Sequence, residues 1–421
     1  MTKARAPESD RAGSATAVLV VTPWFPNRPA DSNAAYVYKS AAAMARRGLQ
    51  VHVAVCRPWL PRGLRHLPPE WMRGDVELGA FQEFRSITCL RYAVVPGAHF
   101  RNLSNRSMDF TLSRALARAL RRTGARLLHV HTEGLSPPAV QTAHALGLRS
   151  IVTLHGINTD PHFLRAGKQR GRISQALNRA DRIALVGEPL RAFFKELVGW
   201  DDHFRIVPNG FDVSELPARV RPLLRSDAPI RFISVSNLHE GKGIDITLRA
   251  LACVRGRGLQ DWDYTIVGAG SQRSDLTALS ENLGLTEKVR FIGAQPPRRV
   301  FELLADSDVF VLPSYREAFG IAYLEAMAAG LVAIGVKGQG PSTFIESGRN
   351  GFLVEPCGVD DLVRTICDIA ERRTDMQAVG YAAAETVRER FSWDAHASSL
   401  LTVYREVLSD HDRQGRSGSC R

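Results

Sequence analysis

Apolar and polar positions alternate along most of the chain with two different periods. Apolar runs of strand length lie at residues 18–21, 50–55, 127–131, 151–154 and 182–186, and again at 231–236, 264–267, 289–292, 309–313 and 332–335. Segments of helical period separate them, for example 33–47 and 107–122, which end near Gly48 and Gly124. Strands that alternate with helices in this way predict parallel sheets covered by crossover helices.

The alternation indicates an α/β chain with two doubly wound, Rossmann-like parallel-sheet domains. The turn-forming triplet Pro208-Asn209-Gly210 marks the break between them. We expect a disordered tail at 1–15, a first domain at 16–209, a second domain at 210–392, a C-terminal helix at 393–410 that crosses back to the first domain, and a polar tail at 411–421. A length of 421 residues suits two or three domains.

The composition excludes several classes of protein. With 44% hydrophobic and 23% charged residues, the chain is typical of globular proteins. No apolar run approaches the roughly 20 residues that span a bilayer, and residues 1–15 lack the apolar core of a signal peptide. The six cysteines show neither a CxxC pair nor metal-like spacing. We therefore expect a cytoplasmic protein organised by neither zinc nor disulfides.

The net charge of +12 is divided unequally. Residues 1–210 hold 30 Lys and Arg against 15 Asp and Glu, a net +15, whereas residues 211–421 hold 25 against 28, a net −3. The basic residues include Arg57, Arg62, Arg65 and Arg73 in segment 57–74, beside Trp59 and Trp71, and seven arginines in segment 101–126. This pattern predicts peripheral contact of the first domain with the anionic inner face of the plasma membrane. The same charges would also solvate a soluble domain or receive an acidic oligosaccharide.

The strongest local signal is the segment 317–325, EAFGIAYLE, which follows a predicted buried strand and opens a helix near Gly320. A glycine there lets a ligand approach the free amides of a helix N-terminus, which favours phosphate. Glu317 before the helix and Glu325 inside it could flank one elongated ligand, such as a diphosphate with hydroxyl groups on either side. The alternative is a helix-start acid and a partly buried glutamate paired with an arginine.

Three further positions lie at predicted strand ends. Lys242 stands just before a crossover helix, where a lysine can neutralise a diphosphate or be an ordinary surface residue. His155 closes the strand at 151–154, at the carboxyl end where open α/β sheets bind ligands, or it is a histidine satisfied in the core. The run at 267–270, VGAG, is a weak dinucleotide fingerprint because Arg273 takes the place of the third glycine.

Together these residues resemble the retaining glycosyltransferases of family four, of GT-B architecture, over nearly the whole chain after the tail. The acid pair Glu317 and Glu325, the glycine-lysine loop at 236–243 and the glycine-rich strand end at 267–270 follow the order of that family. Segments 208–212, 289–293, 308–314 and 350–354 resemble further landmarks in the same order. The opening Trp24-Phe-Pro-Asn27 resembles enzymes that build bacterial cell-surface polysaccharides.

The resemblance implies retaining transfer of a hexose from a nucleotide diphosphate sugar to a carbohydrate or lipid-linked acceptor. The donor would bind the second domain and the acceptor mainly the first, with reaction in the cleft between them. His155 and Glu317 would be catalytic and contact the transferred sugar, whereas the donor would be bound by Asn237, Lys242, Gly268, Phe319, Gly320, Ile321 and Glu325. Within that set, Lys242 and the amides at 319–321 would hold the diphosphate, and Glu325 the ribose. Ser32 and Asn33 would lie on the acceptor side.

The same resemblance implies that no metal or other cofactor is required, because cations and amides can stabilise the departing diphosphate. Retention would follow from attack on the same face of the sugar. Several positions depart from the family pattern. Asn237 stands where arginine is frequent, Asn158 replaces aspartate, Ser32 and Asn33 replace a glycine pair, and Ser342 and Thr343 replace an acidic pair.

These departures keep two alternatives open, a nucleotide-sugar epimerase of the same fold and a catalytically silent basic binding protein. A nucleic-acid partner is disfavoured, because no recognition helix or aromatic-rich stacking strand accompanies the basic charge.

Overall fold

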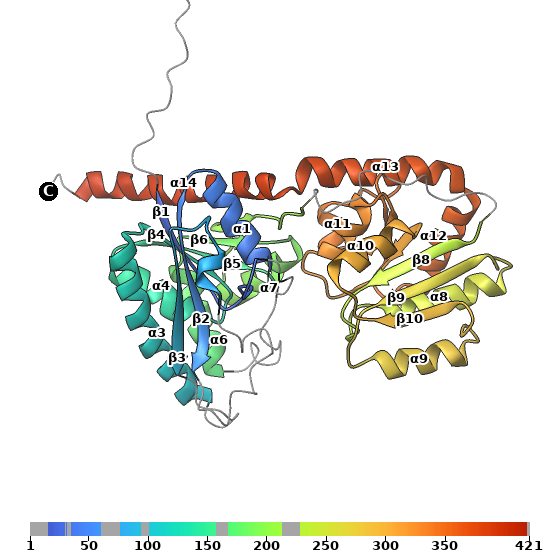
Figure 1. Cartoon of the computed structure of the whole chain (residues 1–421), viewed down its shortest axis with the longest axis horizontal. Coiled ribbons are helices and arrows are strands. Elements are labelled where there is room, and N and C mark those ends of the chain that lie inside the picture. The colour runs from blue at the N-terminus through green and yellow to red at the C-terminus, as the bar shows by residue number, and fades with distance from the viewer. Residues whose placement is uncertain are drawn as a thin grey trace, which may run out of the picture. The chain divides into compact units, whose positions relative to one another are not determined.

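The computed structural model describes residues 16–29, 31, 35–59, 76–93, 101–156, 167–212 and 228–418. Two parallel sheets with covering helices make up this part of the chain, which confirms the predicted fold class (Figure 1). The chain divides into two compact units. The first comprises Met1–Val152, Gln175–Asp181 and Glu406–Arg421, and the second comprises Thr153–Ser174 and Arg182–Arg405.

The first sheet has seven strands in the order β3-β2-β1-β4-β5-β6-β7. These are β1 (Ala17–Thr22), β2 (Gln50–Trp59), β3 (Ser86–Ala93), β4 (Leu127–His131), β5 (Arg149–Leu154), β6 (Arg182–Leu185) and β7 (Phe204–Ile206). Its helices are α1 (Ala35–Arg46), α3 (Arg101–Thr123), α4 (Ser136–Ala145), α6 (Gly167–Arg179) and α7 (Pro189–Val198), with the 3-10 turn η2 (Leu78–Ala80). Every residue of β1 and β4 is buried. Strands covered on both faces therefore appear as continuous apolar runs.

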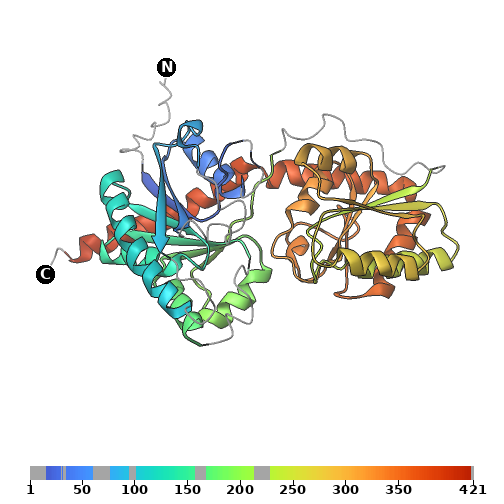
Figure 2. The same ribbon diagram turned by 60° about the horizontal axis from the view of Figure 1, so that its bottom comes forward.

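The second sheet has six strands in the order β10-β9-β8-β11-β12-β13. These are β8 (Ile230–Val235), β9 (Trp262–Val267), β10 (Val289–Gly293), β11 (Val309–Val311), β12 (Val332–Val336) and β13 (Phe352–Val354). The remaining elements are α8 (Ile244–Gly256), α9 (Arg273–Asn282), α10 (Pro297–Ala305), α11 (Ile321–Ala328), η5 (Gly340–Thr343), α12 (Val359–Glu371), α13 (Arg373–Arg390) and α14 (Trp393–Gly418). Helix α8 packs on α9 and α12, and α11 packs on α10 and α13, so that helices lie above and below the strands (Figure 2).

Each strand predicted from the sequence is present, but three strands were missed. The missed strands β3, β7 and β13 all lie at the edge of a sheet. Strand β3 is half-exposed over most of its length, and β7 and β13 have three residues each. An edge strand pairs on one side only, so it lacks the long apolar run by which the central strands are identified.

The predicted break at residue 210 lies between the sheets, because β7 ends at Ile206 and β8 begins at Ile230. The predicted C-terminal helix is present as α14, and it continues to Gly418. The expectation of a polar tail at 411–421 is therefore wrong as far as residue 418. That this helix crosses back to the first domain stays a prediction.

The strand order reverses once in each sheet, between β1 and β4 in the first and between β8 and β11 in the second. Chain segments leave two such strands toward opposite sides, so the loops after them diverge and open a crevice at the carboxyl edge of the sheet. These two switch points are where a doubly wound fold binds ligands.

Arg57 on β2 has a structural role in the first sheet. Its side chain is fully buried. The guanidinium group donates hydrogen bonds to the carbonyl oxygens of Pro23 and Phe25, at 3.1 and 2.9 Å, and to Oδ1 of Asn27, at 3.4 Å. Arg57 therefore holds the loop after β1, and its place among the predicted membrane-facing basic residues is wrong. Arg62, Arg65 and Arg73 lie outside the described residues.

Replacing Arg57 by leucine is expected to lower the free energy of unfolding by about 3 kcal/mol, because it leaves two buried carbonyl oxygens without their charged donor. Urea denaturation measures this loss. The matched control is Arg85→Leu at an exposed position just before β3. Surface substitutions of that kind change stability by about 0.5 kcal/mol or less, and equal losses in both variants would contradict the assigned role.

Candidate active site

Two loops meet at the switch point of the second sheet. Strand β8 leads into loop 236–243 before α8, and β11 leads into loop 312–320 before α11. The amide of Tyr315 and the hydroxyl group of Ser314 both donate hydrogen bonds to the carbonyl oxygen of Gly241, at 2.9 and 3.0 Å. The two loops are therefore fastened to each other through backbone and side chain.

An ion pair between Lys242 and Glu317 joins the same two loops. Lys242 Nζ lies 2.8 Å from Glu317 Oε2, and the side chains are 25% and 15% exposed. The amide of Glu317 donates to Oε1 of Gln339 at 3.0 Å, and its carbonyl oxygen accepts from the amide of Gly340 at 2.8 Å. The structure thus brings together two residues to which the sequence assigns separate roles, and the loop after β12 positions Glu317.

Gly320 shapes the start of α11. Its φ of +95° is in the left-handed region, and a Cβ atom there would lie 2.6 Å from the ring of Tyr323. Within the described part of the chain, the amides of Phe319, Gly320 and Ile321 donate no hydrogen bond to a protein acceptor. Three amide groups are thus available at the positive end of the α11 dipole, an arrangement that suits phosphate.

The other two acid and aromatic positions of this segment have different surroundings. Phe319 is buried against Phe344 and Phe391, with ring centroids at 5.7 and 6.2 Å, so that its backbone alone is available to a ligand. Glu325 is half-buried inside α11. Its contact with a ribose stays a prediction.

The glycine-rich end of β9 has a packing explanation. Gly268 has a φ of +136°, and a Cβ atom there would lie 1.8 Å from the carbonyl oxygen of Ser236. Gly270 likewise leaves no room, because its Cβ atom would lie 2.2 Å from the carbonyl oxygen of Leu238. The loops after β8 and β9 therefore pack backbone against backbone, with Asn237 exposed between these contacts. The donor-binding roles of Gly268 and Asn237 remain predictions.

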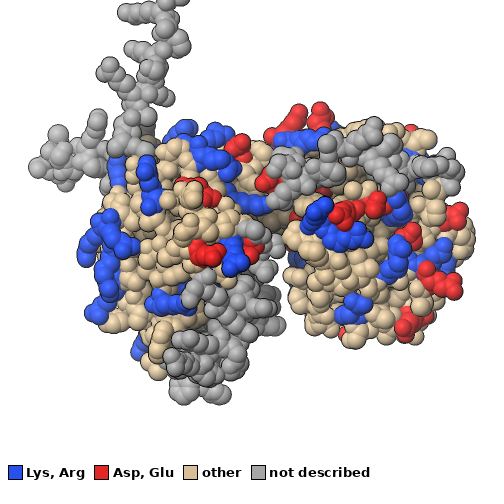
Figure 3. Space-filling model, viewed as in Figure 1, with Lys and Arg blue, Asp and Glu red and all other residues tan. Residues whose placement is uncertain are grey.

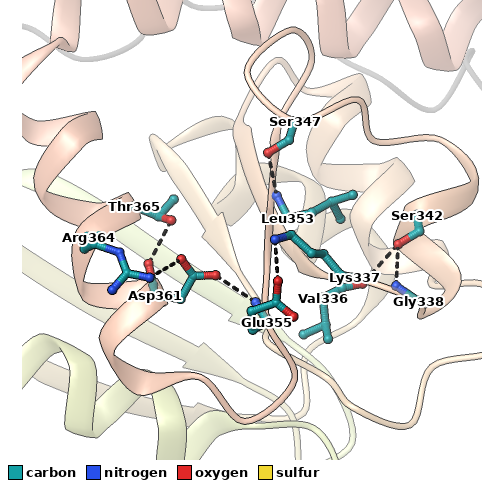
Figure 4. Close-up of polar contacts among 10 residues, drawn as sticks. All are labelled: Val336, Lys337, Gly338, Ser342, Ser347, Leu353, Glu355, Asp361, Arg364 and Thr365. Atoms are coloured by element: carbon teal, nitrogen blue, oxygen red, sulfur yellow. Dashed lines mark hydrogen bonds and ion pairs between the residues drawn. The ribbon is translucent and has the colours of Figure 1, made fainter.

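The departures Ser342 and Thr343 lie in η5. Ser342 Oγ accepts from the amide of Gly338 at 2.9 Å and donates to the carbonyl oxygen of Val336 at 3.3 Å, which closes the turn after β12 (Figure 4). The hydroxyl group of Thr343 is buried and bonds to none of the described residues. Ser342 therefore serves the loop itself.

His155 follows β5, as predicted, and is half-buried. Burial lowers the pKa of His155 to about 3, the neighbouring His396 lowers it as well, and a hydrogen bond with Asn209 opposes them. Burial also lowers the pKa of His396 to about 4, although its Nδ1 bonds to the carbonyl oxygen of Pro208 at 2.7 Å. Both imidazoles are therefore neutral at pH 7. His155 can donate or accept a hydrogen bond there, but it carries no charge.

Some predicted positions cannot be compared with the structure, and some contributing residues were not predicted. Ser32, Asn33 and Asn158 lie outside the described residues. Gln339, which bonds to Glu317, and Asn209, which bonds to His155, were interpreted only as turn residues. Their signal was a polar side chain among turn-forming glycines and prolines at the end of a strand.

Two further findings apply to the described residues alone. Among them, no three His, Cys, Asp or Glu side chains are grouped as ligands of a metal ion would be. None of their helices combines the length and apolar character required to cross a bilayer.

The fold and this site define the chain as a glycosyltransferase of the GT-B type. Residues 34–215 match the model of Glycosyltransferase Family 4, and residues 219–386 match that of Glycosyl transferases group 1. The two matches together span most of the chain. The protein belongs to the glycosyltransferases of the family-four type.

Individual proteins support this assignment. D-inositol 3-phosphate glycosyltransferase of Nocardia farcinica is 28% identical over 412 residues, which cover 89% of this chain and 84% of the relative. Lipopolysaccharide core biosynthesis glycosyltransferase LpsE of Rhizobium meliloti is 30% identical over 208 residues, 49% of this chain and 59% of the relative. The fold is similar to that of Anabaena HepE in complex with UDP and glucose, with a TM-score of 0.68, 17% identity, and coverage of 93% of this chain and 100% of HepE.

The buried neutral histidines predict a loss of stability in acid. Since the folded-state pKa of His396 is about 4 and an unfolded histidine titrates near 6.5, the unfolded chain binds its proton first as the pH falls. This group therefore lowers the unfolding free energy between pH 6.5 and about 4, by at most about 1.4 kcal/mol per pH unit. His396→Gln is expected to show a smaller difference in unfolding free energy between pH 7.5 and pH 5 than the parent protein.

Urea denaturation at both pH values measures this difference. His239→Gln, at an exposed position, is the matched control and is expected to leave the difference as it is in the parent. The same acid sensitivity in the His396 variant and the parent would mean that His396 is not responsible.

Proposed function

We propose that the protein is a retaining glycosyltransferase that moves a hexose from a nucleotide diphosphate sugar to a carbohydrate or lipid-linked acceptor. The observation that carries this proposal is the Lys242–Glu317 pair beside the three available amides at 319–321. A lysine and a helix N-terminus that flank one crevice are suited to the negative charge of a departing diphosphate.

In this mechanism the donor is held by groups of different chemistry. The amides at 319–321 and Lys242 bind the diphosphate oxygens, and they stabilise the charge that develops as the sugar leaves. Glu325 accepts hydrogen bonds from the ribose hydroxyl groups. Glu317 contacts the transferred sugar while Gln339 and Gly340 hold its backbone. No metal and no protein nucleophile enter this scheme, in which the acceptor attacks the face that the leaving group departs from.

The neutral state of His155 fits a role toward a sugar hydroxyl group. With its pKa lowered to about 3, the imidazole bonds to an uncharged group without the attraction for phosphate that a cation would have. Asn209 holds one side of the ring. Its proposed contribution is therefore to orient the transferred sugar.

Similar proteins support the choice of substrates. The complex of HepE contains UDP and glucose, and LpsE is named for lipopolysaccharide core biosynthesis. We accordingly place this protein in the cytoplasm, in the synthesis of a cell-surface polysaccharide or glycolipid. Incubation with a panel of nucleotide sugars tests the activity, with detection of the released nucleoside diphosphate and mass spectrometry of the lipid-linked acceptors. Conversion of a donor into its epimer without an acceptor would instead identify the epimerase alternative.

Four substitutions separate donor binding from turnover. Lys242→Ala and Glu325→Ala are expected to weaken donor binding roughly tenfold or more, because charge-assisted hydrogen bonds contribute about 1.5–3 kcal/mol. His155→Ala and Glu317→Gln are expected to lower turnover with little effect on nucleoside diphosphate affinity, because their contacts are to the reacting sugar. Glutamine keeps an acceptor for Lys242, which lies 2.8 Å away. Calorimetry and initial rates measure the two effects.

The controls come from an exposed ion pair in the same unit. Lys337 Nζ bonds to Glu355 Oε1, with side chains 50% and 59% exposed (Figure 4). Lys337→Ala and Glu355→Ala are expected to leave donor affinity and turnover unchanged. Donor binding by the Lys242 variant as tight as by the Lys337 variant would remove Lys242 from the site.

A lipid-linked acceptor also requires access to a membrane, and one face of α3 has the composition for it. Leu103 and Phe110 are 54% and 57% exposed. Exposed arginines share that face, at the helical spacing of three or four residues: Arg106, Arg114, Arg118 and Arg121. The guanidinium carbon of Arg114 lies 3.8 Å from the ring centroid of Phe110. Lys and Arg side chains line the edge of the molecule that α3 occupies (Figure 3).

Replacing these four arginines of α3 by glutamine is expected to weaken binding to phosphatidylglycerol vesicles at least tenfold at low salt, since each basic residue near anionic lipid contributes about 1 kcal/mol. Vesicle co-sedimentation measures this. The control variant removes the same charge elsewhere, through glutamine at the exposed positions Arg249, Arg257, Arg298 and Arg299. Equal binding of the parent to neutral and anionic vesicles, or equal losses in the two variants, would contradict the assignment.

A further inference from the structure

The switch point of the first sheet carries a group of side chains outside the candidate active site. It lies between β1 and β4 in the strand order. Trp24 follows β1, Tyr36 belongs to the first turn of α1, and Glu133 follows β4. Because β1 and β4 pair in parallel, the loops at their carboxyl ends begin at the same edge of the sheet.

Trp24 and Tyr36 form an aromatic pair within this group. Their ring centroids lie 6.1 Å apart, with an angle of 52° between the ring planes. Both side chains are half-buried, so part of each ring reaches the surface. The hydroxyl group of Thr22 accepts from the amide of Trp24 and donates to its carbonyl oxygen, both at 3.0 Å. Together with the hydrogen bonds of Arg57 to Pro23 and Phe25, these contacts fix the loop that presents Trp24.

Glu133 places a buried carboxylate beside this pair. It is 1% exposed and accepts a hydrogen bond from the hydroxyl group of Thr132 at 3.1 Å. Burial raises the pKa of Tyr36, and the negative charge of Glu133 raises it further. The phenol of Tyr36 therefore stays protonated within the field of that carboxylate.

The backbone before Glu133 is strained. Thr132 has a φ of +131°, which is an outlier for a β-branched residue. Strain of this kind persists where the surrounding structure enforces it, and it gathers at ligand-binding sites. Here it ends β4 in a turn in which the amide of Gly134 donates to the hydroxyl group of Thr132, at 3.3 Å.

We propose that Trp24 and Tyr36 bind the acceptor as a neutral, unphosphorylated sugar ring, and that Glu133 selects against phosphate. The exposed faces of two aromatic rings suit the C–H face of a sugar. A buried negative charge beside them favours the hydrogens of hydroxyl groups and repels an anionic acceptor. The inference rests on the proposed function, because a transferase requires an acceptor.

Saturation-transfer NMR on the full chain in the presence of UDP tests this. The probes are the methyl glycosides of glucose, galactose and mannose and the corresponding sugar 6-phosphates. At least one neutral glycoside is expected to receive saturation mainly at its ring C–H protons, and to bind at least tenfold more tightly than its 6-phosphate. Titration with UDP on the same samples reports the donor site independently.

Two substitutions, each with a matched control, locate the site. Trp24→Leu is expected to weaken binding of the neutral sugar at least tenfold, whereas Trp59→Leu, at a tryptophan 56% exposed, leaves it unchanged. Glu133→Gln is expected to lower the preference for the neutral sugar over its 6-phosphate at least tenfold. Glu83→Gln, which alters an exposed carboxylate bonded to the hydroxyl group of Tyr38 at 2.6 Å, leaves that preference intact. A role of Glu133 in folding alone would not change this selectivity.

The outcomes separate this inference from the proposed function. UDP binding without binding of any neutral sugar, or equal binding of the neutral sugars and their 6-phosphates, overturns the inference and leaves the donor site standing. Equal effects of the Trp24 and Trp59 substitutions overturn it as well. If Glu133→Gln does not fold, as judged by circular dichroism, the Trp24 comparison decides. Absence of UDP binding in the folded parent protein counts against the proposed function itself.

Discussion

The parallel pairing of β8 with β11 is the constraint on which the candidate active site depends. These two strands are neighbours in space, yet 73 residues separate the end of β8 at Val235 from the start of β11 at Val309. Their chain segments leave toward opposite sides, so the lysine loop and the glutamate loop begin at the same edge. The 2.8 Å contact of Lys242 with Glu317 then follows from sheet topology, and the available amides of α11 follow from the helix that must begin there.

Close backbone packing at this edge explains why the loops are rich in glycine. Gly243 would place a Cβ atom 2.2 Å from the carbonyl oxygen of Pro313, and Gly268 would place one 1.8 Å from that of Ser236. A side chain at either position would push neighbouring loops apart and displace Lys242 or Asn237. A glycine-rich strand end is therefore weak evidence for a nucleotide when taken alone, because the protein itself occupies the space that the glycine leaves. The amides and the ion pair are the stronger evidence.

The sequence predicted the interior of the fold better than its margins, for a physical reason. Central strands such as β4 are covered on both faces, and their apolar runs match the observed bounds from Leu127 to His131. The edge strands β3, β7 and β13 depend on one neighbour each, and no local pattern announces that neighbour. Within the site, Glu317 and Lys242 were found as motif residues, but their mutual contact and the support from Gln339 depend on loops 75 and 22 residues apart.

Charge illustrates the same difference between composition and structure. The count of basic residues in the first half is correct, yet it treats a buried Arg57 and an exposed Arg118 alike. Arg57 donates to backbone carbonyl oxygens and acts on the loop that carries Trp24, whereas Arg118 lies on the open face of α3. Burial makes a charge part of the internal hydrogen bonding, and exposure leaves it available to a partner. The excess of +15 in the first half therefore performs at least two tasks, since it stiffens one ligand-facing loop and supplies one basic surface.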